Sequence, residues 1–306
     1  MKTHVTEAFS KRNVEHVKFH EPLARYTTWR IGGLADVLVA PASVQELRGA
    51  LQAASDLGLP WTVIGKGSNV LVQDGGVRGL VLHMGGAFAD ISVQGTKVIA
   101  QAGRSFVSAA NISLRNDLQG LEFATGIPGS VGGAVMMNAG AHGGEVREVL
   151  EWADAMDSEG RVHHFTNADL QFDYRYSILK DNPMVVVTAC FNLEPGNGQP
   201  LLQEVKRWSV RRAATQPLSQ PNCGSVFRNP PGNYSARLIE TAGLKGLRRG
   251  DAQISEKHAN FIVNLGHATA RDVLWLMNHV QETVANQFNI HLETEVRIIG
   301  EPASGR

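Results

Sequence analysis

The sequence predicts an α+β protein with more than one domain, and three observations lead to that prediction. Residues 35–65 read as a short β-α-β unit, residues 70–104 continue as strand-like runs between glycine turns, and helical periodicity dominates residues 201–213 and 269–284. The chain has 306 residues, of which 43% are hydrophobic, so it can bury at least one good core and more than one small domain. No internal repeat is evident.

The charge balance indicates a small-molecule partner. Lysine and arginine together number 29, as do aspartate and glutamate, and the sequence pI is about 7.2. A neutral chain gives no electrostatic reason to bind nucleic acid or an anionic membrane, so we expect neither partner. The first twenty residues are too polar for a signal peptide, no apolar run approaches membrane-spanning length, and two cysteines give no disulfide framework. We therefore expect a cytoplasmic protein.

The β-α-β unit begins at Ala35. ADVLVAP reads as a strand, and SVQELRGALQAASDLGLP follows as a helix in which Ser43 and Glu46 have the spacing of a capping box. WTVIG reads as a second strand, and the later runs ISVQG and KVIAQAG continue the β-pattern. This half of the chain is therefore expected to be rich in sheet.

The elements after residue 104 follow from the same periodicities. A helix is predicted from Ser105 to about Leu118, and the turn DSEG separates the strands WADAMD and RVHHF. PMVVVTACFNLEP reads as a buried strand, and Gly196 to Pro200 as a linker. Two helices follow, LLQEVKRWSVRRA and one that begins near Thr269, and the strand-like HLETEVRIIG closes the chain.

Two glycine-rich segments are the first candidates for a ligand site. In IGKGSNVLV, Gly65 and Gly67 directly follow a strand, and small residues there let backbone amides approach a phosphate closely. The segment lacks the third glycine of the dinucleotide-binding fingerprint and continues as a strand instead of a helix. A simple glycine turn between two strands explains the pattern equally well.

The second segment, GIPGSVGGAV, has glycines at 126, 129, 132 and 133. They leave one face of the segment almost without side chains, which permits close approach of a flat ligand or of another backbone. Tight packing of a helix on a sheet is the alternative. Two such segments in one chain suggest a long ligand.

Charged side chains supply further candidates. Arg175 lies between two tyrosines in FDYRYSILK, and it can hold a carboxylate or an enolate in a planar fork or be an exposed cation at a strand edge. Glu293 and Glu295 are two apart in a strand-like run and are expected on one face of it. The basic helix from Lys206 to Arg212 could rim a phosphate site or be a solvated face. The eleven histidines show no metal-ligand spacing, so no metal is expected.

Seven motifs occur in one order along the chain: YTTWRIGG, IGKGSNVLV, GIPGSVGGAVMMNAGA, YRYSILK, CGSVFRNP, GLKG with ISEKHANFIVN, and LETEVRIIG. In this combination the chain resembles the UDP-N-acetylenolpyruvoylglucosamine reductase family (UDP-N-acetylmuramate dehydrogenase, MurB) from about Tyr26 to Arg297. The stretch between FDYRYS and CGSVF is short and carries no tyrosine-bearing insert. The chain therefore resembles the shorter, type II form of the family.

The resemblance implies an architecture. It implies an FAD-binding domain in two parts, of the PCMH/vanillyl-alcohol-oxidase type, and a smaller α+β substrate-binding domain. The expected boundaries are 20–85 for the first FAD-binding subdomain, 86–202 together with the C-terminal strand 291–306 for the second, and 203–290 for the substrate-binding domain. The return of the final strand would carry Glu295 into a site shared with Ser225.

The resemblance also implies a reaction and its residues. The reaction is the FAD-dependent reduction of UDP-N-acetylglucosamine enolpyruvate to UDP-N-acetylmuramate, with NADPH as hydride donor, in peptidoglycan precursor synthesis, and we expect the protein to act as a monomer. By motif position Ser225 matches the proton donor, and Arg175 and Glu295 match the residues that stabilise the enol intermediate. The implied FAD-binding residues are Ile64, Gly65, Lys66, Gly67, Ser68, Asn69, Val70, Gly126, Pro128, Gly129, Ser130, Gly132, Gly133 and Ala134.

The chemistry of an enolpyruvyl ether is consistent with these three roles. Hydride addition to the methylene carbon builds negative charge on the adjoining carbon and its carboxylate, so a nearby cation and a hydrogen-bonding acid lower the barrier. Arg175 suits the first task. Glu295 can help an enol only if it carries or shares a proton. Serine is a poor acid in water, so Ser225 must act at a strongly basic, carbanion-like centre with its hydroxyl aimed by the fold.

Three other functions are compatible with parts of the sequence. A flavin oxidase of the same fold could act on a small alcohol or lactone, although the sequence lacks a histidine-linked or cysteine-linked flavin attachment signal. A hydrolase could use Cys223 or Ser225 as nucleophile, with His258 as a conceivable base. The chain could also be a nucleotide-binding module without catalysis.

Overall fold

The computed structural model describes residues 2–15, 17–196 and 198–303, which form two compact units, each with its own buried core. Six stretches of sequence alternate between the two units, three in each. Unit 1 comprises Met1–Phe19, Val37–Lys66 and Gly79–Val210, and unit 2 comprises His20–Asp36, Gly67–Arg78 and Arg211–Arg306.

Unit 1 holds most of the secondary structure before residue 211. Its helices are α1 (Lys2–Lys11), α2 (Val44–Asp56), α3 (Phe106–Arg115), α4 (Val131–Met136), α5 (Val146–Val149), most of α6 (Gly198–Thr215), and the short 3-10 helices η2 (Glu122–Gly126) and η3 (Ile178–Lys180). Its strands are β3 (Trp61–Ile64), β6 (Ile91–Gln94), β7 (Lys97–Gln101), β8 (Leu118–Gln119), β9 (Gly140–Ala141), β10 (Gly144–Glu145), β11 (Leu150–Met156), β12 (Val162–Thr166), β13 (Val185–Asn192) and β14 (Glu194–Pro195). Strands with residues in both units are β1 (Val17–Pro22), β2 (Leu34–Val39) and β5 (Val77–His83).

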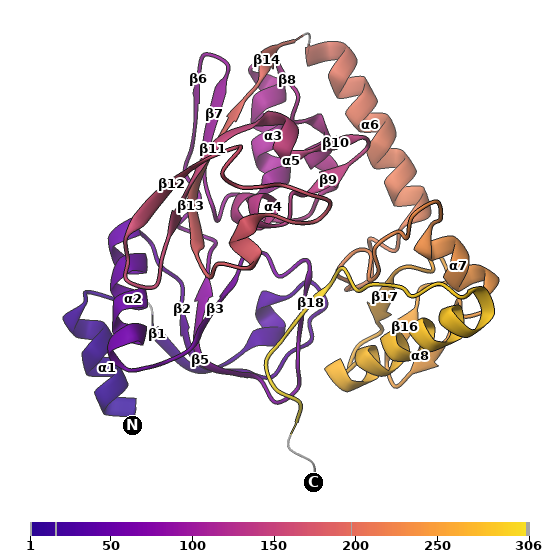
Figure 1. Cartoon of the computed structure of the whole chain (residues 1–306), viewed down its shortest axis with the longest axis horizontal. Helices are drawn as coiled ribbons and strands as arrows, with labels where there is room; N and C mark the ends of the chain where they lie inside the picture. The colour runs from indigo at the N-terminus through magenta and orange to yellow at the C-terminus, as the bar shows by residue number, and fades with distance from the viewer. Residues whose placement is uncertain (1, 16, 197, 304–306) are drawn as a thin grey trace. The chain divides into compact units, whose positions relative to one another are not determined.

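A five-stranded antiparallel sheet of order β12-β11-β13-β7-β6 is the frame of unit 1 (Figure 1). Helix α3 lies against β7, and α4 lies against β7 and β13. A four-stranded sheet has the order β1-β2-β5-β3, and its β3 and β5 run parallel. β9 with β10, and β8 with β14, form short antiparallel pairs.

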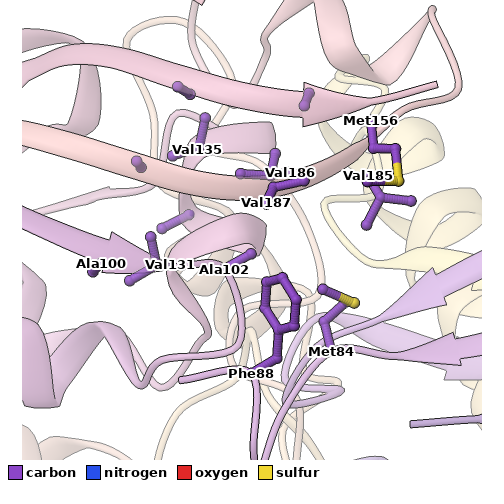
Figure 2. Packing of buried hydrophobic residues seen from close by; sticks show 14 of the residues in the cluster. Met84, Phe88, Ala100, Ala102, Val131, Val135, Met156, Val185, Val186 and Val187 are labelled. Carbon is purple, nitrogen blue, oxygen red and sulfur yellow. The ribbon is translucent and has the colours of Figure 1, made fainter. Parts of the chain in front are cut away.

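One face of α4 is buried against the large sheet. Val131 and Val135 are one helical turn apart and belong to the same buried cluster as Val186 and Val187 of β13 (Figure 2). Burying one valine side chain contributes about 1.5–3 kcal/mol, so this pair is enough to fix a helix of only six residues. The packing determines which face of α4 is left for a ligand.

Unit 2 contains η1 (Leu23–Tyr26), β4 (Val70–Val72), α7 (Ser235–Thr241), β15 (Arg248–Arg249), β16 (Ala252–Ile254), β17 (Ile262–Asn264), α8 (Ala270–Phe288) and β18 (Arg297–Ile299). Helix α8 lies along the antiparallel β15-β16-β17 sheet. The chain's most C-terminal strand, β18, pairs in parallel with β4. The buried Trp29 packs in this core and donates from Nε1 to the carbonyl oxygen of Ile262 at 2.7 Å.

The long helix α8 confirms the prediction made from its start signal and periodicity. Thr269 and Asp272 form a capping box, and Asp74 accepts a hydrogen bond from the N–H of Ala270 at 2.8 Å. The helix ends at Asn289, which adopts the left-handed conformation with φ at 55°. The predicted apolar face is buried and comprises Val273, Leu276, Met277, Val280 and Val284.

Most of the other predicted elements are confirmed, but three expectations need correction. In the capping box predicted for α2, the Ser43 half is present, whereas Glu46 is turned away from Ser43 and accepts the N–H groups of Ala42 and Glu15. The linker predicted for residues 196–200 is wrong from residue 198, where α6 begins, because Pro200 falls in the first turn and a helix needs no N–H there. Residue 197 lies outside the described residues.

The third correction concerns the end of the chain. Of the strand predicted at residues 291–300, only β18 is regular. Residues 293–295 instead make single main-chain hydrogen bonds with residues 226–228, and one isolated bridge joins Phe227 and Thr294.

Among the helices of the described residues, none has both the length and the apolar character needed to cross a bilayer.

Candidate active site and cofactor cradle

The first glycine segment, residues 64–70, follows β3 and is divided between the two units. In unit 1, the hydroxyl group of Ser130 lies where a side chain on Gly65 would be. In unit 2, Gly67 has a φ of 61° and packs so closely on the main chain of Tyr26 that a Cβ atom would overlap it. Both glycines are therefore required by close approach, and the predicted strand follows them.

The end of this segment joins the C-terminal part of the chain within unit 2. Asn69 donates from Nδ2 to the carbonyl oxygen of Glu295 at 3.1 Å and accepts the N–H of Arg297 at its own carbonyl oxygen, also at 3.1 Å. Val70 begins β4 and pairs with Arg297, and Ser68 is half-buried. A segment expected to bind FAD therefore runs beside Glu295, a predicted catalytic residue.

The second glycine segment, residues 126–134, ends in α4. Ser130 is the N-cap, and its buried hydroxyl group accepts the N–H of Gly133 at 3.3 Å. Gly132 donates to the carbonyl oxygen of Ala102 at 2.9 Å, and a Cβ atom on Gly132 would lie only 2.9 Å from that of Ala102. Gly133 is exposed. Tight packing therefore explains Gly132, while Gly133 provides the open face that a ligand requires.

An aromatic stack lies at the start of the same segment. A Cβ atom on Gly126 would lie 3.0 Å from Nε2 of His142, and the His142 ring stacks on Trp208 with 4.4 Å between ring centroids and 3° between ring planes. Pro128 is exposed, and the carbonyl oxygen of Gly129 accepts a hydrogen bond from the first residue of α3. Trp208 thus ties the basic helix α6 to the turn between β9 and β10.

A pair of cations lies beside the N-cap of α4. The N–H of Val131 donates to the carbonyl oxygen of Arg104 at 2.8 Å. The Arg104 guanidinium donates to Ala89 and Ser108, whereas its Nε is buried without a hydrogen-bond partner among the described residues. Lys66 is largely exposed, and partial burial and, as a second cause, the charge of Arg104 lower the pKa of its amine.

These features of unit 1 fit the diphosphate of a dinucleotide cofactor. The electrostatic effect of Arg104 on Lys66, together with an orphaned buried donor, which is rare in a folded protein, favours an anion nearby. The exposed, side-chain-free surface of Gly133 allows a phosphate to approach the main chain. The residues present are therefore suitable for holding FAD by its negatively charged centre.

Arg175 occupies a tight turn in unit 1. Asp173 and Tyr176 exchange main-chain hydrogen bonds at 3.1 and 3.2 Å, and Arg175 between them is left-handed, with φ at 55°. Its guanidinium donates to the carbonyl oxygen of Gly140 at 3.0 Å and lies 4.9 Å from the centroid of the Tyr174 ring. A non-glycine residue in this conformation is uncommon and costs about 1 kcal/mol or more, so the turn presents Arg175 from a fixed backbone.

Ser225 and Glu295 are neighbours in unit 2. The N–H of Glu295 donates to the carbonyl oxygen of Val226 at 2.8 Å, so Glu295 lies beside the residue that follows Ser225. Both predicted catalytic side chains are half-buried. Gly224, which has a φ of 81°, makes the turn before Ser225, and its N–H donates to the side chain of Asn222 at 2.9 Å. The structure therefore places the main-chain segments of two of the three residues proposed for catalysis side by side.

The segment that carries Ser225 is held by a buried asparagine that the sequence did not single out. The Asn260 carboxamide accepts the N–H of Phe227 at 2.9 Å and donates to the carbonyl oxygen of Phe227 at 2.8 Å. The main-chain carbonyl oxygen of Asn260 accepts the N–H of Val226 at 2.9 Å. Both main-chain polar groups of Phe227, two residues after Ser225, are thus held by the Asn260 side chain.

The two glutamates of LETEVRI flank Thr294 at an antiparallel bridge and alternate with the buried Leu292 and Val296, which agrees with the expectation that they share one face of an extended segment. Their surroundings differ. Glu293 is exposed and faces Arg228 at 3.4 Å, whereas Glu295 is half-buried and its charge helps to raise the pKa of the Cys223 thiol.

Cys223 lacks the properties of a nucleophile. It is buried, and burial together with the charge of Glu295 raises the pKa of its thiol well above the usual value. The hydrogen bonds found for His258 within the described chain join it to Ser255 and Asn260, not to Cys223 or Ser225. The hydrolase alternative that used Cys223 with His258 as base therefore has no geometric support.

The remaining candidates have structural partners. Lys180 donates to the carbonyl oxygen of Arg175 at 3.3 Å, and Arg212 of the basic helix α6 donates to Gln216 at 2.8 Å. The two adjacent histidines of β12 pair with different aspartates, His163 with Asp157 and His164 with Asp154. Among the residues that the structure describes, no group of histidine, cysteine, aspartate and glutamate side chains is arranged to hold a metal ion.

Sequence reasoning missed Arg104 and Asn260 because their roles depend on residues distant in the chain. A signal for Arg104 is present in AGRS, where an arginine directly precedes the helix N-cap Ser105 and follows Gly103. For Asn260, a polar residue between apolar neighbours in HANFIVN is the only sign that its side chain is buried.

Two family profiles match the chain in succession. The FAD binding domain profile matches residues 35–166, and the profile of the UDP-N-acetylenolpyruvoylglucosamine reductase C-terminal domain matches residues 216–299. The matches place an FAD-binding domain on the segments that include the cation pair and both glycine loops, and the second domain on the segments that carry Ser225 and Glu295.

Curated relatives with the same description cover almost the whole chain. The UDP-N-acetylenolpyruvoylglucosamine reductase of Rubrobacter xylanophilus is 48% identical over 93% of this chain and 96% of its own length. That of Halalkalibacterium halodurans is 44% identical over 97% of this chain and 99% of its own length.

Solved structures agree with these matches. The crystal structure of UDP-N-acetylenolpyruvylglucosamine reductase from Thermus caldophilus superposes with a TM-score of 0.80 at 37% identity, covering 91% of this chain and 97% of that chain. Berberine bridge enzyme from Eschscholzia californica, at 12% identity and a TM-score of 0.50, covers 63% of this chain and 44% of its own. This second likeness concerns the fold alone, and it agrees with the α+β FAD-binding architecture expected from the sequence.

Proposed function

The chain belongs to the UDP-N-acetylenolpyruvoylglucosamine reductase family, and from that premise we propose that it reduces UDP-N-acetylglucosamine enolpyruvate to UDP-N-acetylmuramate. It is an FAD-dependent oxidoreductase, and the proposed hydride donor is NADPH. The proposal assigns the catalytic roles to Arg175, Ser225 and Glu295. It excludes the alternatives of a hydrolase, a flavin oxidase of a small alcohol or lactone, and a nucleotide-binding module without catalysis.

The proposed FAD seat consists of the two glycine segments and the adjacent cations. Lys66 and the orphaned Nε of Arg104 would offset the charge of the diphosphate, and Gly133 would let it reach main-chain N–H groups. The role proposed for Gly65 follows from its motif position. The roles proposed for the other residues of the segments follow from the motif positions: Ile64, Gly67, Ser68, Asn69, Val70, Gly126, Pro128, Gly129, Ser130, Gly132 and Ala134.

FAD held by the two glycine segments would supply the hydride chemistry, from NADPH to the methylene carbon of the enolpyruvyl group. The negative charge that then builds on the adjoining carbon and carboxylate is proposed to be stabilised by the Arg175 guanidinium. Its fixed turn supports this role, because a cation that is held in place needs little reorganisation as the charge develops.

Ser225 is proposed to donate its hydroxyl proton to that carbon, while Glu295 shares a proton with the enol form of the carboxylate. One observation carries this assignment: the hydrogen bond between the N–H of Glu295 and the carbonyl oxygen of Val226, which holds the two predicted side chains on adjoining segments. The lock by Asn260 on the Ser225 segment further supports a preorganised donor.

The test is a visible spectrum recorded anaerobically while first NADPH and then UDP-N-acetylglucosamine enolpyruvate are added. We expect a flavin band that bleaches with NADPH and returns with the enolpyruvyl sugar. A band that bleaches but does not return would overturn the proposed substrate. Bleaching with NADH but not with NADPH would overturn the proposed donor alone.

The proposal also includes a division into FAD-binding subdomains at 20–85 and 86–202, the latter with the strand 291–306, and a substrate-binding domain at 203–290. We also propose that the protein is a monomer and acts in the cytoplasm. Limited proteolysis tests the boundaries, and light scattering of the purified protein tests the monomer.

A further inference from the structure

Asn138 is a fully buried polar residue directly after α4. Its φ is 40°, so it is left-handed, and it occupies the position at which such a residue ends a helix. The N–H of Asn138 donates to the carbonyl oxygen of Val135, and the next residue, Ala139, donates to that of Ala134. These two bonds form a Schellman motif, so the backbone at Asn138 is determined by helix termination.

The side chain of Asn138 makes three hydrogen bonds to two other segments. Its Nδ2 donates to the carbonyl oxygen of Asp173 and to Oε2 of Glu145, both at 3.0 Å, and its Oδ1 accepts the N–H of Arg147 at 3.0 Å. Both donor hydrogens and the acceptor oxygen are therefore used. Asp173 is the first residue of the turn that presents Arg175.

Two further contacts attach the same turn to the end of α4. The Ser177 hydroxyl group donates to the carbonyl oxygen of Met136 at 2.8 Å. The Arg175 guanidinium donates to the carbonyl oxygen of Gly140, two residues after Asn138. The turn is thus held at its start, at its exit and through its functional side chain by residues 136–140.

We infer that Asn138 is a positioning residue that holds the Asp173–Tyr176 turn and thereby sets the location of the Arg175 guanidinium during reduction of the enolpyruvyl group. The inference rests on the role of Arg175 in the proposed function. A displacement of a catalytic group by about 1 Å can lower the rate about a hundredfold. Asn138 itself touches neither substrate nor cofactor in this assignment.

The left-handed backbone of Asn138 and the hydrogen bonds of its carboxamide can be tested separately. Glycine accepts a left-handed conformation at a helix C-terminus at least as well as asparagine does. Asn138→Gly therefore keeps the helix end and removes only the carboxamide. A second variant, Asn138→Asp, keeps the acceptor for Arg147 but lacks the donors and places a carboxylate beside Glu145.

The experiment uses the FAD-loaded enzyme and measures its two half-reactions by stopped flow. For Asn138→Gly and Asn138→Asp we expect flavin reduction by NADPH within about twofold of wild type. Flavin reoxidation by the enolpyruvyl sugar is expected to be about ten- to hundredfold slower. Amide hydrogen exchange of the protein gives an independent readout, because the N–H of Tyr176 should lose protection when the turn is released.

A double-mutant cycle with Arg175→Lys decides whether Asn138 acts through Arg175. The double variant Asn138→Gly/Arg175→Lys should reoxidise no more slowly than Arg175→Lys alone. Rate losses that multiply would overturn the inference. If Arg175→Lys reoxidises at the wild-type rate, the proposed role of Arg175 fails, and the exchange of Tyr176 still decides whether Asn138 holds the turn.

Asn264 provides a matched control within unit 2. It is a buried asparagine whose carboxamide makes three hydrogen bonds, to Trp29, Gly266 and Ala268. Asn264→Ala should lower the melting temperature but leave reoxidation per folded enzyme and the exchange of Tyr176 unchanged. If it slows reoxidation as much as Asn138→Gly does, the effect of Asn138 is a general loss of stability and the inference is wrong.

Discussion

The main-chain N–H of Glu295 donates a 2.8 Å hydrogen bond to the carbonyl oxygen of Val226, and this bond makes Glu295 a neighbour of the segment that carries Ser225. Asn69 holds Glu295 from the other side, through a 3.1 Å bond to its carbonyl oxygen. Asn69 of the glycine loop and the segments that carry Ser225 and Glu295 are therefore linked by hydrogen bonds that use neither the Ser225 nor the Glu295 side chain. Substitution of either side chain leaves these main-chain bonds in place.

Ser225→Ala should therefore separate chemistry from folding. We expect flavin reduction by NADPH at the wild-type rate and reoxidation by the enolpyruvyl sugar about 10²–10⁴-fold slower, the usual loss for a positioned acid. Glu295→Gln should behave similarly and melt close to the wild-type temperature. Equal reoxidation rates in Ser225→Ala and wild type would remove Ser225 from the mechanism.

Cys223 should be dispensable for the reaction. Burial raises the pKa of its thiol well above the usual value, so little reactive thiolate forms near neutral pH. Burial and the Glu151 charge likewise raise the pKa of Cys190 to about 11. We expect native protein to resist iodoacetamide at pH 8 and Cys223→Ala to retain reductase activity. Rapid alkylation with parallel loss of activity would contradict both expectations.

Cofactor affinity should fall at alkaline pH because of Lys66. Burial and Arg104 lower its pKa from 10.5, so Lys66 loses its charge at a lower pH than an ordinary lysine, and its attraction for a diphosphate is lost as pH rises. Titration of apoprotein with FAD, followed by fluorescence, measures this effect. In Lys66→Arg, where the charge persists, the pH dependence should be flatter.

Arg104→Gln should weaken FAD binding at every pH, by about ten- to hundredfold, because it removes a buried charged donor. Because the charge of Arg104 helps to lower the pKa of Lys66, the alkaline loss of affinity should also move to higher pH in Arg104→Gln, whereas in Lys66→Arg it should become flatter. If affinity for FAD is unaffected, the unpaired Nε of Arg104 has another explanation.

Asp157 should contribute to stability in a pH-dependent way. Burial opposes its ionisation, but hydrogen bonds from His163 and Arg161 lower the pKa of the carboxyl group below the ordinary 3.8. A carboxyl group whose pKa is lowered by folding stabilises the folded state at pH values above its unfolded-state pKa. This stabilisation is lost as the pH falls toward the folded-state pKa. Asp157→Asn should cost about 1–3 kcal/mol at pH 7, measured by urea unfolding.

At pH 3 the difference between wild type and Asp157→Asn should be smaller than at pH 5, because the carboxylate contributes less once pH is below 3.8. Glu159→Gln is a suitable control, since Glu159 is exposed and contacts the same Arg161. A stability difference that stays constant from pH 7 to pH 3 would disprove the ionic origin of the effect.

The elements with strong local signals could be predicted from the sequence. Helix α8 has a cap and a long apolar face, and the strands before and after the glycine loops have uniform patterns. The end of the chain could not be predicted in the same way. Residues 293–295 look like part of a long strand, yet they make only an isolated bridge to a distant segment, which a local pattern does not reveal.

The candidate site was predicted mainly through motif resemblance, and its supporting residues were not predicted at all. Ser225 and Glu295 are distant in sequence, and nothing in their spacing indicates that they lie together. Arg104 and Asn138 belong to ordinary strand-to-helix and helix-to-turn junctions. Their importance arises from what surrounds them in three dimensions: an unpaired donor in one case, three filled hydrogen bonds in the other.

The pairing of β4 with β18 has a consequence for synthesis of the protein. β4 consists of Val70–Val72, and its partner Arg297–Ile299 is made more than two hundred residues later. While the chain emerges from the ribosome, unit 1 can acquire nearly all of its residues before unit 2 has the strand that completes this pair. A nascent chain interrupted before residue 297 would expose the edge of β4, and with it a surface open to wrong pairing.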